Sequence, residues 1–436
     1  MPIDIYVGMD HNQQRMRSSL QPSQVFGVLL GVLAIFGAAR AASPVLTTLY
    51  QFSGSADGGY PTAPVAIGAG GVLYGTTIYG GASGNGAVFS LTPPTAPGNA
   101  WTEAVIYSFT GGSDGGSPLA GLVIGANGVI YGVAGGGIYG DGVVFSVTPP
   151  VSPGDQWAEA ILHSFSSDLP STVDGGGPAG SLVLGRDGTL YGTTALGGVY
   201  GMGVAFSLTP PSSHGGAWTE LLLYSFGANG DAAGPRGLVG GPGGVLYGIG
   251  GGGAYNLGSV FSLTPPSTQG GVWQEAVLHS FSGYFSDGGP PMANSVAVGA
   301  GGVLYGATYY GGAYQRGTIF SLTPPTAPGG AWTEAVLYNF SFQSGEKPEG
   351  GLTLSKAGIL YGTTSTGGNT FSASGTIFQL APPSSTGGAW KYTRLYVFPY
   401  DATPMAGLVI GSGSVLYGTT SGGPYARTGS VFSFVP

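Results

Sequence analysis

The sequence has 436 residues, of which only 7% are charged, and a formal net charge of −8. A charge-poor, weakly acidic chain argues against nucleic-acid binding, which needs clustered lysines and arginines. The sequence contains no cysteine, which excludes disulfides, thiolate chemistry and a lipid-modified cysteine.

The N-terminal segment, residues 1–41, differs in composition from the rest of the chain. Arg15 and Arg17 precede an apolar run over residues 25–39, and an A-x-A pattern ends at Ala41. This order of charge, apolar run and small-residue cleavage site is typical of a secretory signal peptide, which we predict over residues 1–41. The alternative is an uncleaved membrane anchor, although the run is shorter than the roughly 20 residues that a spanning helix needs.

The segment PVLTTLYQF, from Pro44 to Phe52, is the first predicted strand after the signal peptide. It aligns with WTEAVIYSF, which begins at Trp101, and with YTRLYVF, which begins at Tyr392. Each of those two segments ends a repeated unit, whereas Pro44 to Phe52 stands before the first unit. We therefore interpret it as a spare fourth strand.

A unit of 56–60 residues then recurs seven times. Its marker is a Tyr-Gly pair, found at Tyr74, Tyr131, Tyr191, Tyr247, Tyr305, Tyr361 and Tyr417. The tryptophans keep the same spacing, and we predict that they are structural anchors of the outer strand: Trp101, Trp157, Trp218, Trp273, Trp332 and Trp390. A fixed period of this length indicates a repeat architecture.

Each unit contains four short apolar runs bounded by Gly, Pro, Asn or Asp, a pattern that predicts four strands. In the second unit the runs are residues 122–124, 129–133, 143–147 and 158–165. Asn127-Gly128 joins the first two of these runs, and Asp187-Gly188 has the same place in the next unit. Such pairs favour a type I′ hairpin turn. A Pro-Pro pair ends the third strand, because proline has no amide donor.

Seven units of four antiparallel strands, without helical periodicity, predict an all-β fold: a seven-bladed β-propeller over residues 42–436. Each blade of a propeller is covered on both faces by its neighbours, which explains the near-continuous apolar runs. The last unit stops at VFSFVP, after its third strand. We predict that the spare strand near Val45 to Phe52 pairs with Ser430 to Phe434, which closes the ring and removes two sheet edges.

The tandem string LYGTT…GG…G-[TAS]-[VI]-F-x-LTPP resembles the GloVer repeat of bacterial secreted and surface proteins. The resemblance covers residues 44–436 and implies a fold class and secretion. It implies no chemistry, because the family has no established activity. Members are often described with a choice of C-terminal anchor, and we expect no such anchor in this chain.

Two sets of loops are expected to emerge on one face of the propeller. The Gly-rich loops between second and third strands carry the candidate ligand-binding residues Tyr139, Tyr200, Tyr255, Tyr314 and Tyr425. The loops that lead into the next blade carry the candidate carboxylates Asp57, Asp114, Asp174, Asp287 and Asp401. Aromatic rings offer apolar platforms with a polar tip, and carboxylates accept sugar hydroxyls or bind calcium. The pattern predicts a glycan- or ion-binding face.

A structural role is the alternative for both sets. Aspartate before Gly-Gly is ordinary turn chemistry, because its side chain bonds nearby backbone amides, and the tyrosines can pack between blades. No D-x-D-x-D-G run is present, so we expect no cofactor, with calcium as the weaker alternative. His163 and His279 replace the tyrosine of the L-Y-S-F strand and are interpreted as structural substitutions.

The repeated glutamate of the W-x-E motif is interpreted as a protective charge on an edge strand rather than a catalytic acid; the set is Glu103, Glu159, Glu220, Glu275 and Glu334. Departures from the repeat are better candidates for a site. They are Arg236, Arg316, Arg427 and the charged loop over residues 345–349. Neutral variation in exposed loops is the alternative explanation.

We predict a secreted, monomeric binding or surface-interaction propeller, without catalytic residues or a metal, in the extracellular space or the cell envelope (periplasm or outer surface). The expected partner is an extracellular glycan or a protein, with no nucleic acid and no membrane span after signal cleavage. The alternatives are a propeller enzyme acting on extracellular polysaccharide and a purely structural envelope protein. An enzyme would show several non-repeated polar residues converging at the channel mouth, whereas the other two would keep near-symmetric loops.

Overall fold

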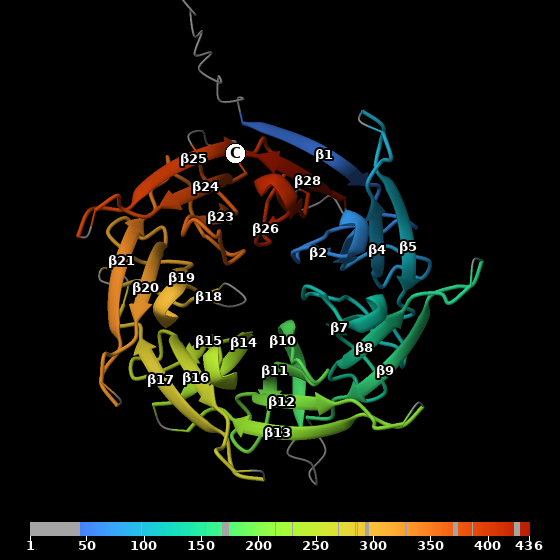
Figure 1. Ribbon diagram of the computed structural model, residues 1–436, viewed down its shortest axis with the longest axis horizontal. Coiled ribbons are helices and arrows are strands. Elements are labelled where there is room, and N and C mark those ends of the chain that lie inside the picture. Colours follow the sequence, from blue (N-terminus) through green and yellow to red (C-terminus); the bar gives the residue numbers. More distant parts are fainter. Residues whose placement is uncertain are drawn as a thin grey trace, which may run out of the picture. The chain divides into compact units, whose positions relative to one another are not determined.

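The computed structural model describes residues 44–436 apart from 97, 153, 168–173, 214, 229, 269, 284, 286, 293–295, 328, 369–373, 386 and 423–427. The predicted signal peptide, residues 1–41, lies outside the described residues. Within the unit Ser43–Pro436, the described strands form seven four-stranded sheets that follow one another around a ring (Figure 1). The predicted all-β, seven-bladed propeller is confirmed.

Each blade runs from an innermost strand at the centre of the ring to an outermost strand at its rim (Figure 1). The innermost strands are β2 (Ala66–Ile67), β6 (Val123–Ile124), β10 (Gly175–Leu184), β14 (Ala232–Gly240), β18 (Ala297–Val298), β22 (Leu352–Leu354) and β26 (Val409–Ile410). The second strands carry the Tyr-Gly pair and are β3 (Leu73–Thr77), β7 (Ile130–Ala134), β11 (Leu190–Gly197), β15 (Leu246–Gly252), β19 (Leu304–Thr308), β23 (Leu360–Thr364) and β27 (Leu416–Thr420).

The third strands are buried on both faces and are β4 (Ala87–Thr92), β8 (Val143–Thr148), β12 (Val204–Thr209), β16 (Ser259–Thr264), β20 (Thr318–Thr323), β24 (Thr376–Ala381) and β28 (Gly429–Val435). The outermost strands are β5 (Thr102–Ser108), β9 (Ala158–Ser164), β13 (Thr219–Ser225), β17 (Gln274–Ser280), β21 (Thr333–Asn339), β25 (Lys391–Val397) and β1 (Val45–Phe52). Blades 1 to 6 begin at β2, β6, β10, β14, β18 and β22, and blade 7 consists of β26, β27, β28 and β1.

Strand β1 closes the ring as predicted. It pairs antiparallel with β28, with Val45 opposite Val435 and Phe52 opposite Gly429. A second contact joins the first and last blades, because Thr419 Oγ1 donates a hydrogen bond to the carbonyl of Ala63 at 3.1 Å. The first and last strands of the propeller therefore share one sheet.

The turn between the first two strands of blade 2 is the predicted type I′ turn. Asn127 and Gly128 both have positive φ, 56° and 76°, and the amide of Val129 donates to the carbonyl of Ala126 at 3.2 Å. Five blades have such a turn, assigned as the short 3₁₀ elements η1 (Ala69–Gly71), η2 (Ala126–Gly128), η3 (Pro242–Gly244), η4 (Ala300–Gly302) and η5 (Ser412–Ser414).

The type I′ prediction was wrong at Asp187-Gly188. Only Gly188 has a positive φ there, 85°, and its amide donates to the carbonyl of Gly185 at 3.1 Å. Asp187 keeps a negative φ because its carboxylate accepts the amide of Thr189 at 3.1 Å. The hydrogen-bonded turn therefore spans residues 185–188, one residue earlier than its counterpart in blade 2. The result is a three-residue connection that ends in a left-handed glycine.

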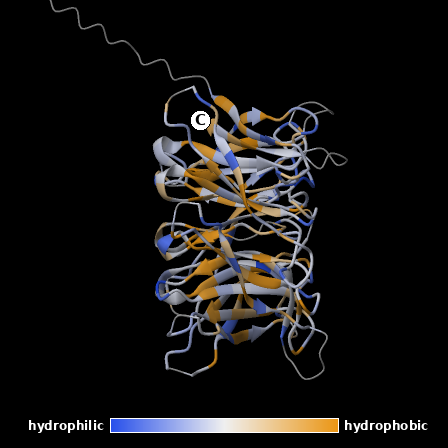
Figure 2. Ribbon diagram, turned by 90° about the vertical axis from the view of Figure 1, so that its right-hand side faces the viewer, coloured by the Kyte–Doolittle hydropathy of each residue, from blue (hydrophilic) through white to orange (hydrophobic). Residues whose placement is uncertain are grey.

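The hydrophobic core lies between neighbouring blades. Phe109, at the end of β5, meets Phe145 of β8 edge-on at 5.1 Å between ring centroids, and both rings are fully buried. The same contact recurs at all seven blade interfaces, at 4.9–5.4 Å. Figure 2, which views the ring from its edge, shows the hydrophobic residues along the strands. Each blade is therefore held by both of its neighbours.

The tryptophans extend these interfaces. Each half-buried indole packs against the tyrosine of the Tyr-Gly pair in the preceding blade, at 5.7–6.2 Å between centroids; the pairs are Trp101–Tyr417, Trp157–Tyr74, Trp218–Tyr131, Trp273–Tyr191, Trp332–Tyr247 and Trp390–Tyr305. Edge-on aromatic pairs are worth about 0.5–1.5 kcal/mol beyond the area they bury. The prediction that the tryptophans are structural anchors is confirmed.

Candidate functional site

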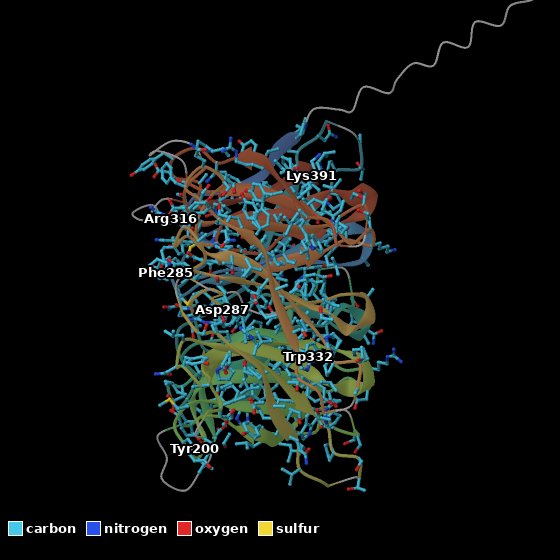
Figure 3. All side chains as sticks on the ribbon, turned by 90° about the vertical axis from the view of Figure 1, so that its left-hand side faces the viewer. Tyr200, Phe285, Asp287, Arg316, Trp332 and Lys391 are labelled. Atoms are coloured by element: carbon cyan, nitrogen blue, oxygen red, sulfur yellow. The ribbon has the colours of Figure 1, made fainter. Side chains whose placement is uncertain are left out.

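The two expected loop sets share one face of the ring, here called the loop face. It carries the loops between second and third strands and the loops that enter the next blade, whereas the turn face carries η1 to η5 and the Pro-rich loops. Figure 3 views the ring from its edge and places Tyr200, Phe285 and Arg316 on the loop face, with Trp332 further toward the turn face. This arrangement follows from strand topology, because alternate connections of an antiparallel blade emerge at the same end.

The candidate tyrosines point into solvent. Their exposed fractions are 54% for Tyr139, 54% for Tyr200, 60% for Tyr255 and 62% for Tyr314, while Tyr425 lies outside the described residues. The alternative that these rings pack between blades was wrong for the four described ones. They come from the loops of blades 2, 3, 4 and 5, so consecutive blades each present one ring.

Other apolar side chains are exposed beside these tyrosines. The loop face also exposes Leu119, Ile138, Leu196, Val199, Met202, Phe285, Tyr310 and Tyr400. Large apolar side chains gathered on one face of a protein mark an interaction surface more often than scattered ones do. The loop face is therefore the best candidate for recognition among the described surfaces.

The candidate carboxylates fix the loops that enter each blade. Asp57 accepts the amide of Ser53 at 2.8 Å and the hydroxyl of Tyr50 at 3.1 Å. Burial opposes ionisation of Asp57, but the hydrogen bonds from Ser53 and Tyr50 outweigh it and lower the pKa of the carboxyl group. Asp57 thus acts as a turn-forming residue, as the structural alternative proposed.

The same arrangement recurs in the next loops. Asp114 accepts the hydroxyl of Tyr107 at 2.9 Å. Asp174 and Asp287 contact a histidine instead, with Nε2 of His163 at 3.2 Å and Nε2 of His279 at 3.1 Å, so each imidazole replaces a tyrosine hydroxyl. A ligand or a calcium ion at these carboxylates would compete with bonds that the chain already makes.

Asp401 is the exception among the candidate carboxylates. It is exposed, has a φ of 74°, and lies only three residues after Phe398. It lines a cavity of about 230 Å³ together with Leu46 and Tyr396, between blades 6 and 7. The structure therefore places the five candidate aspartates in two different settings, and their role in ligand binding stays a prediction.

The glutamates of the W-x-E motif form a feature that sequence reasoning missed. Glu103 of blade 1 is half-buried against Tyr50 of blade 7 and Asp57 of the loop that enters blade 1. Its Oε1 is buried without a described hydrogen-bond partner. Burial, and then the charge of Asp57, raise the pKa of Glu103 to about 7. Glu103 does lie on the outermost strand, as expected, but its half-burial and raised pKa do not fit the interpretation as a protective charge on an edge strand.

The other four glutamates behave alike. Each has a buried Oε1 without a described partner, and burial comes first among the causes that raise its pKa. The raised pKa is about 7 for Glu159 and Glu334 and about 8 for Glu275, and Glu220 shifts in the same direction. We call each group of one tyrosine or histidine, one aspartate and one glutamate a seam triad.

The sequence held a signal for these triads. In the loop that enters blade 6, Ser344 replaces the aspartate and caps the amide of Ser341 at 2.8 Å. In the same blade Tyr392 replaces the glutamate and stacks on Tyr338, with centroids 4.1 Å apart and planes 5° apart. Aspartate and glutamate are thus lost together, which is the pattern expected of residues that contact each other.

One seam triad brings together a possible set of metal ligands. Nε2 of His163 and carboxylate oxygens of Asp174 and Glu220 lie within 4.8 Å of one another. Asp174 already accepts hydrogen bonds from His163 and from the amide of Gly175, and Tyr50 and Tyr107 replace the histidine in other triads. The recurrence of the triad with tyrosine favours hydrogen bonding between blades over metal binding.

A non-repeated polar cluster lies at the centre of the loop face. Seven equivalent residues each follow a proline at the loop-face end of the innermost segment: Thr62, Leu119, Ala179, Arg236, Met292, Glu349 and Met405. Glu349 accepts the hydroxyl of Ser365 at 2.6 Å and that of Tyr309. The charge of Glu349 also acts on Arg236, so these residues of blades 4, 5 and 6 belong to one electrostatic cluster.

The other departures from the repeat join the same region. Arg316 forms an ion pair with Glu346, whose side chain is only 6% exposed, and the ammonium of Lys347 lies 5.6 Å from the ring centroid of Tyr309. Neutral variation in exposed loops does not explain an ion pair in which the Glu346 carboxylate is buried. Convergence of non-repeated polar residues is the feature expected of an enzyme, and it is present here; Arg427 lies outside the described residues.

The electrostatics of this cluster bear on its chemistry. Burial, and then the charge of Glu349, raise the pKa of Tyr309 above its ordinary value. The phenol therefore keeps its proton at neutral pH and serves as a hydrogen-bond donor rather than a general base. The geometry suits the holding of a polar ligand better than proton abstraction by Tyr309.

A family model of the Gloeobacter/Verrucomicrobia repeat matches residues 34–175, 99–294 and 177–432. The chain belongs to this repeat family. The resemblance to GloVer repeats seen in the sequence is thereby confirmed over nearly all of the propeller. No match was found among curated proteins.

Solved structures share the fold of this GloVer-repeat protein at low identity. The extracellular domain of a putative one-component system from B. thetaiotaomicron has a TM-score of 0.52 at 12% identity, covering 89% of this chain and 41% of the other. A polysaccharide lyase, an ulvan lyase bound to a GlcA-Rha3S saccharide, has a TM-score of 0.51 at 12% identity, covering 85% and 93%. At this identity the likeness shows the fold alone. Among the described residues, no helix is long and apolar enough to cross a membrane.

Proposed function

We propose that this GloVer-repeat protein is a secreted, non-enzymatic propeller that binds an extracellular glycan through its loop face. The observation that carries the proposal is the row of exposed rings Tyr139, Tyr200, Tyr255 and Tyr314 on four consecutive blades. A tyrosine ring offers an apolar face to the C–H face of a sugar and a hydroxyl to its polar groups. Rings on successive blades suit an extended oligosaccharide rather than a compact ligand.

Secretion is supported by the N-terminal pattern of arginines, apolar run and A-x-A site over residues 1–41. The proposal includes no cofactor, since the carboxylates of the blade-entry loops are engaged by the chain's own donors. A monomer is sufficient, because the ring closes within one chain. A protein partner at the same apolar face is the outcome that failure of glycan binding would favour.

An enzyme acting on extracellular polysaccharide is the second candidate. It is favoured by the convergence of Arg236, Tyr309 and Glu349 near the centre of the loop face. One protein that shares the fold, at a TM-score of 0.51, is a polysaccharide lyase. That activity is a property of the other protein and not of this chain. The raised pKa of Tyr309 argues against proton abstraction by this phenol, so binding ranks first.

The proposal is tested by measuring glycan binding to the purified chain, first on a glycan array and then by titration calorimetry with an oligosaccharide that the array identifies. A single Tyr200→Ala change should weaken binding only a few-fold, because one stacked ring contributes on the order of 1 kcal/mol. Replacing Tyr139, Tyr200 and Tyr255 together by alanine should nearly abolish binding.

The matched control removes three side chains from the Pro-rich loops of the turn face, with Val151, Asp155 and Val272 changed to alanine. These residues are exposed, so their loss should leave both fold and binding unchanged. Normal binding by the tyrosine variant, with loss in the control, would contradict the loop-face assignment. Release of shortened products from the bound oligosaccharide would contradict the non-enzymatic part of the proposal.

A further inference from the structure

Arg236 stands out at the centre of the loop face. It is the cation among the seven equivalent post-proline residues, whose other members are threonine, leucine, alanine, two methionines and a glutamate. Because the equivalent positions in blades 5 and 7 hold Met292 and Met405, the fold does not require a charge at this place. A residue that departs from its repeat without a structural need is a candidate for ligand recognition.

The guanidinium of Arg236 is half-buried and poorly paired. Its Nη2 donates to Sδ of Met292 at 3.0 Å, and a thioether sulfur is a weak acceptor. Among the described residues, no carboxylate lies within 4.0 Å of it. Glu349 acts on Arg236 only over a longer distance, and its own oxygens accept Ser365 and Tyr309. Burial of a charge without an ion-pair partner carries a free-energy cost that an anionic ligand would offset.

A cavity opens beside Arg236. Its volume is about 330 Å³, at the lower end of the range for small-molecule sites. Blades 2, 3 and 4 line it, mainly with apolar groups such as Leu119, Pro178 and Ala195, and Arg236 is its charged lining residue. The loops of blades 2 and 3 also carry the exposed rings of the proposed glycan site, so one ligand can reach both features.

We infer that Arg236 binds the carboxylate of an acidic oligosaccharide, with a uronate residue seated in this cavity. The inference rests on the proposed glycan-binding function and names the class of glycan. A guanidinium presents a planar fork of N–H donors that matches a carboxylate bidentately, whereas a neutral sugar leaves that fork unpaired. The chain carries a net charge of −8, so long-range attraction does not favour an anionic glycan and selectivity comes from this short-range contact.

The test compares the affinity of the full chain for short oligosaccharides of galacturonate, glucuronate and mannuronate, each with free carboxylates and with the carboxylates methyl-esterified. At least one free-acid oligosaccharide should bind ten-fold or more tightly than its ester. Arg236→Met, which copies the residue of blades 5 and 7, should remove this preference and leave affinity for the ester unchanged. Arg236→Lys should keep a fraction of the preference, because it retains charge without the fork.

Arg186→Met is the matched control, since it removes the same charge from an exposed turn on the opposite face. It should bind the free acids like the original chain, and thermal unfolding should show both methionine variants folded. Equal affinity of the original chain and Arg236→Met for the free acids overturns the inference. Binding of neutral glycans without binding of any free acid overturns it while the proposed function stands. Absence of binding to both classes overturns the proposed function as well.

Discussion

The half-buried glutamates of the seam triads are the least expected residues of this molecule. Glu103 places a carboxyl group against Asp57 and Tyr50 of the neighbouring blade interface, and burial favours the protonated form. A protonated glutamate can donate a hydrogen bond across the seam, whereas an ionised one meets a second negative charge. The triads therefore make the contact between outer strands dependent on pH.

We predict that the free energy of unfolding falls as pH rises from about 5 to 8. The folded pKa values of Glu103, Glu159 and Glu334 are about 7 and that of Glu275 is about 8, against an ordinary value of 4.5. A raised folded pKa means that the native state binds more protons than the unfolded state between these values, so its stabilising contribution is complete below pH 4.5 and is lost as pH rises through 7–8. Urea unfolding across this range measures the slope.

Changing Glu103 and Glu159 to glutamine should flatten that slope, because an amide copies the neutral carboxyl group. Lys391→Gln is the control, since it removes an exposed charge from the outer strand of blade 6, which has no seam triad. A slope that is unchanged by the glutamine variants would show that the seam does not titrate. At the acid end the opposite sign applies: the lowered pKa values of Asp57 and Asp114 predict stability lost as pH falls below their ordinary 3.8.

The role of a residue could be predicted from the sequence where it depends on that position alone. It could not be predicted where it depends on contact with a residue far away in the sequence. The exposed tyrosines follow from their place in Gly-rich loops, and the tryptophans from their strict spacing. The seam triads join a loop to an outer strand about 45 residues further along, and that distance shows only in three dimensions. Arg316 and Glu346 are a second such pair, since neither position alone indicates the ion pair between them.

The second strand of each blade depends on its glycine. Gly132 lies directly against Phe145 of the third strand, and a methyl group added there would come within 2.6 Å of Cζ of Phe145 and 2.8 Å of Cδ2 of Leu122. Phe145 is fully buried and cannot move aside. In this Tyr-Gly pair, the tyrosine thus packs against the tryptophan of the next blade. The glycine leaves room for the phenylalanine ring of its own blade.

We predict that Gly132→Ala lowers the free energy of unfolding by about 1–3 kcal/mol, the usual cost of overpacking a close-packed core. Gly240→Ala is the matched control, because the added methyl group there would lie 3.7 Å from Cγ1 of Val183, an ordinary contact, and φ is not positive. That variant should be neutral or slightly stabilising. Equal losses in the two variants, measured by urea unfolding, would contradict the steric explanation.

Strand boundaries and turn types were predictable to different degrees. Punctuation by Gly, Pro and Asn located the strands because these residues act locally. The turn at Asp187 was not predictable from its dipeptide, since a bond from the Asp187 side chain to Thr189 competes with the type I′ geometry. The free-energy difference between the two turn types is a few kcal/mol at most. The identity of the two central residues does not predict so small a difference.

At the scale of the whole ring, β1 is the closing element. Phe52 of β1 is 1% exposed and packs against Phe89 of blade 1, while the strand covers the edge of β28. We predict that deleting residues 44–52 lowers the thermal unfolding temperature and promotes self-association, because the free edge of β28 is a template for pairing. Calorimetry and light scattering measure the two effects.

A synthetic peptide of residues 44–52, supplied in excess, should restore part of the lost stability by strand addition. The same peptide with proline in place of Thr48 and Tyr50 should fail, because proline lacks the amide donor that the ladder needs. A truncated chain that unfolds like the full one would show that β1 does not close the ring.

The architecture could be predicted from the sequence almost completely, and the candidate site only in part. The same pattern of strands and turns occurs in seven units, so an ambiguous assignment in one unit can be checked against the others. A site depends on what is not repeated, and Arg236 or Glu349 has no second copy to confirm its role. The complementary ends of the chain were the other strong signal, because a missing strand and a spare one point to each other.

The pairing of Val45 with Val435 also determines when the ring can close during synthesis. The ribosome makes β1 before β28, so this contact, which joins distant parts of the propeller sequence, can form only after β28 has been synthesised. Until then the blades form an open arc. The pairing of β1 with β28 is expected to be slow, because contacts between residues far apart in the sequence form slowly. Under the proposed secretion, a ring that stays open until β28 has been made would suit passage through a narrow translocation channel, and β1 and β28 would pair on the far side.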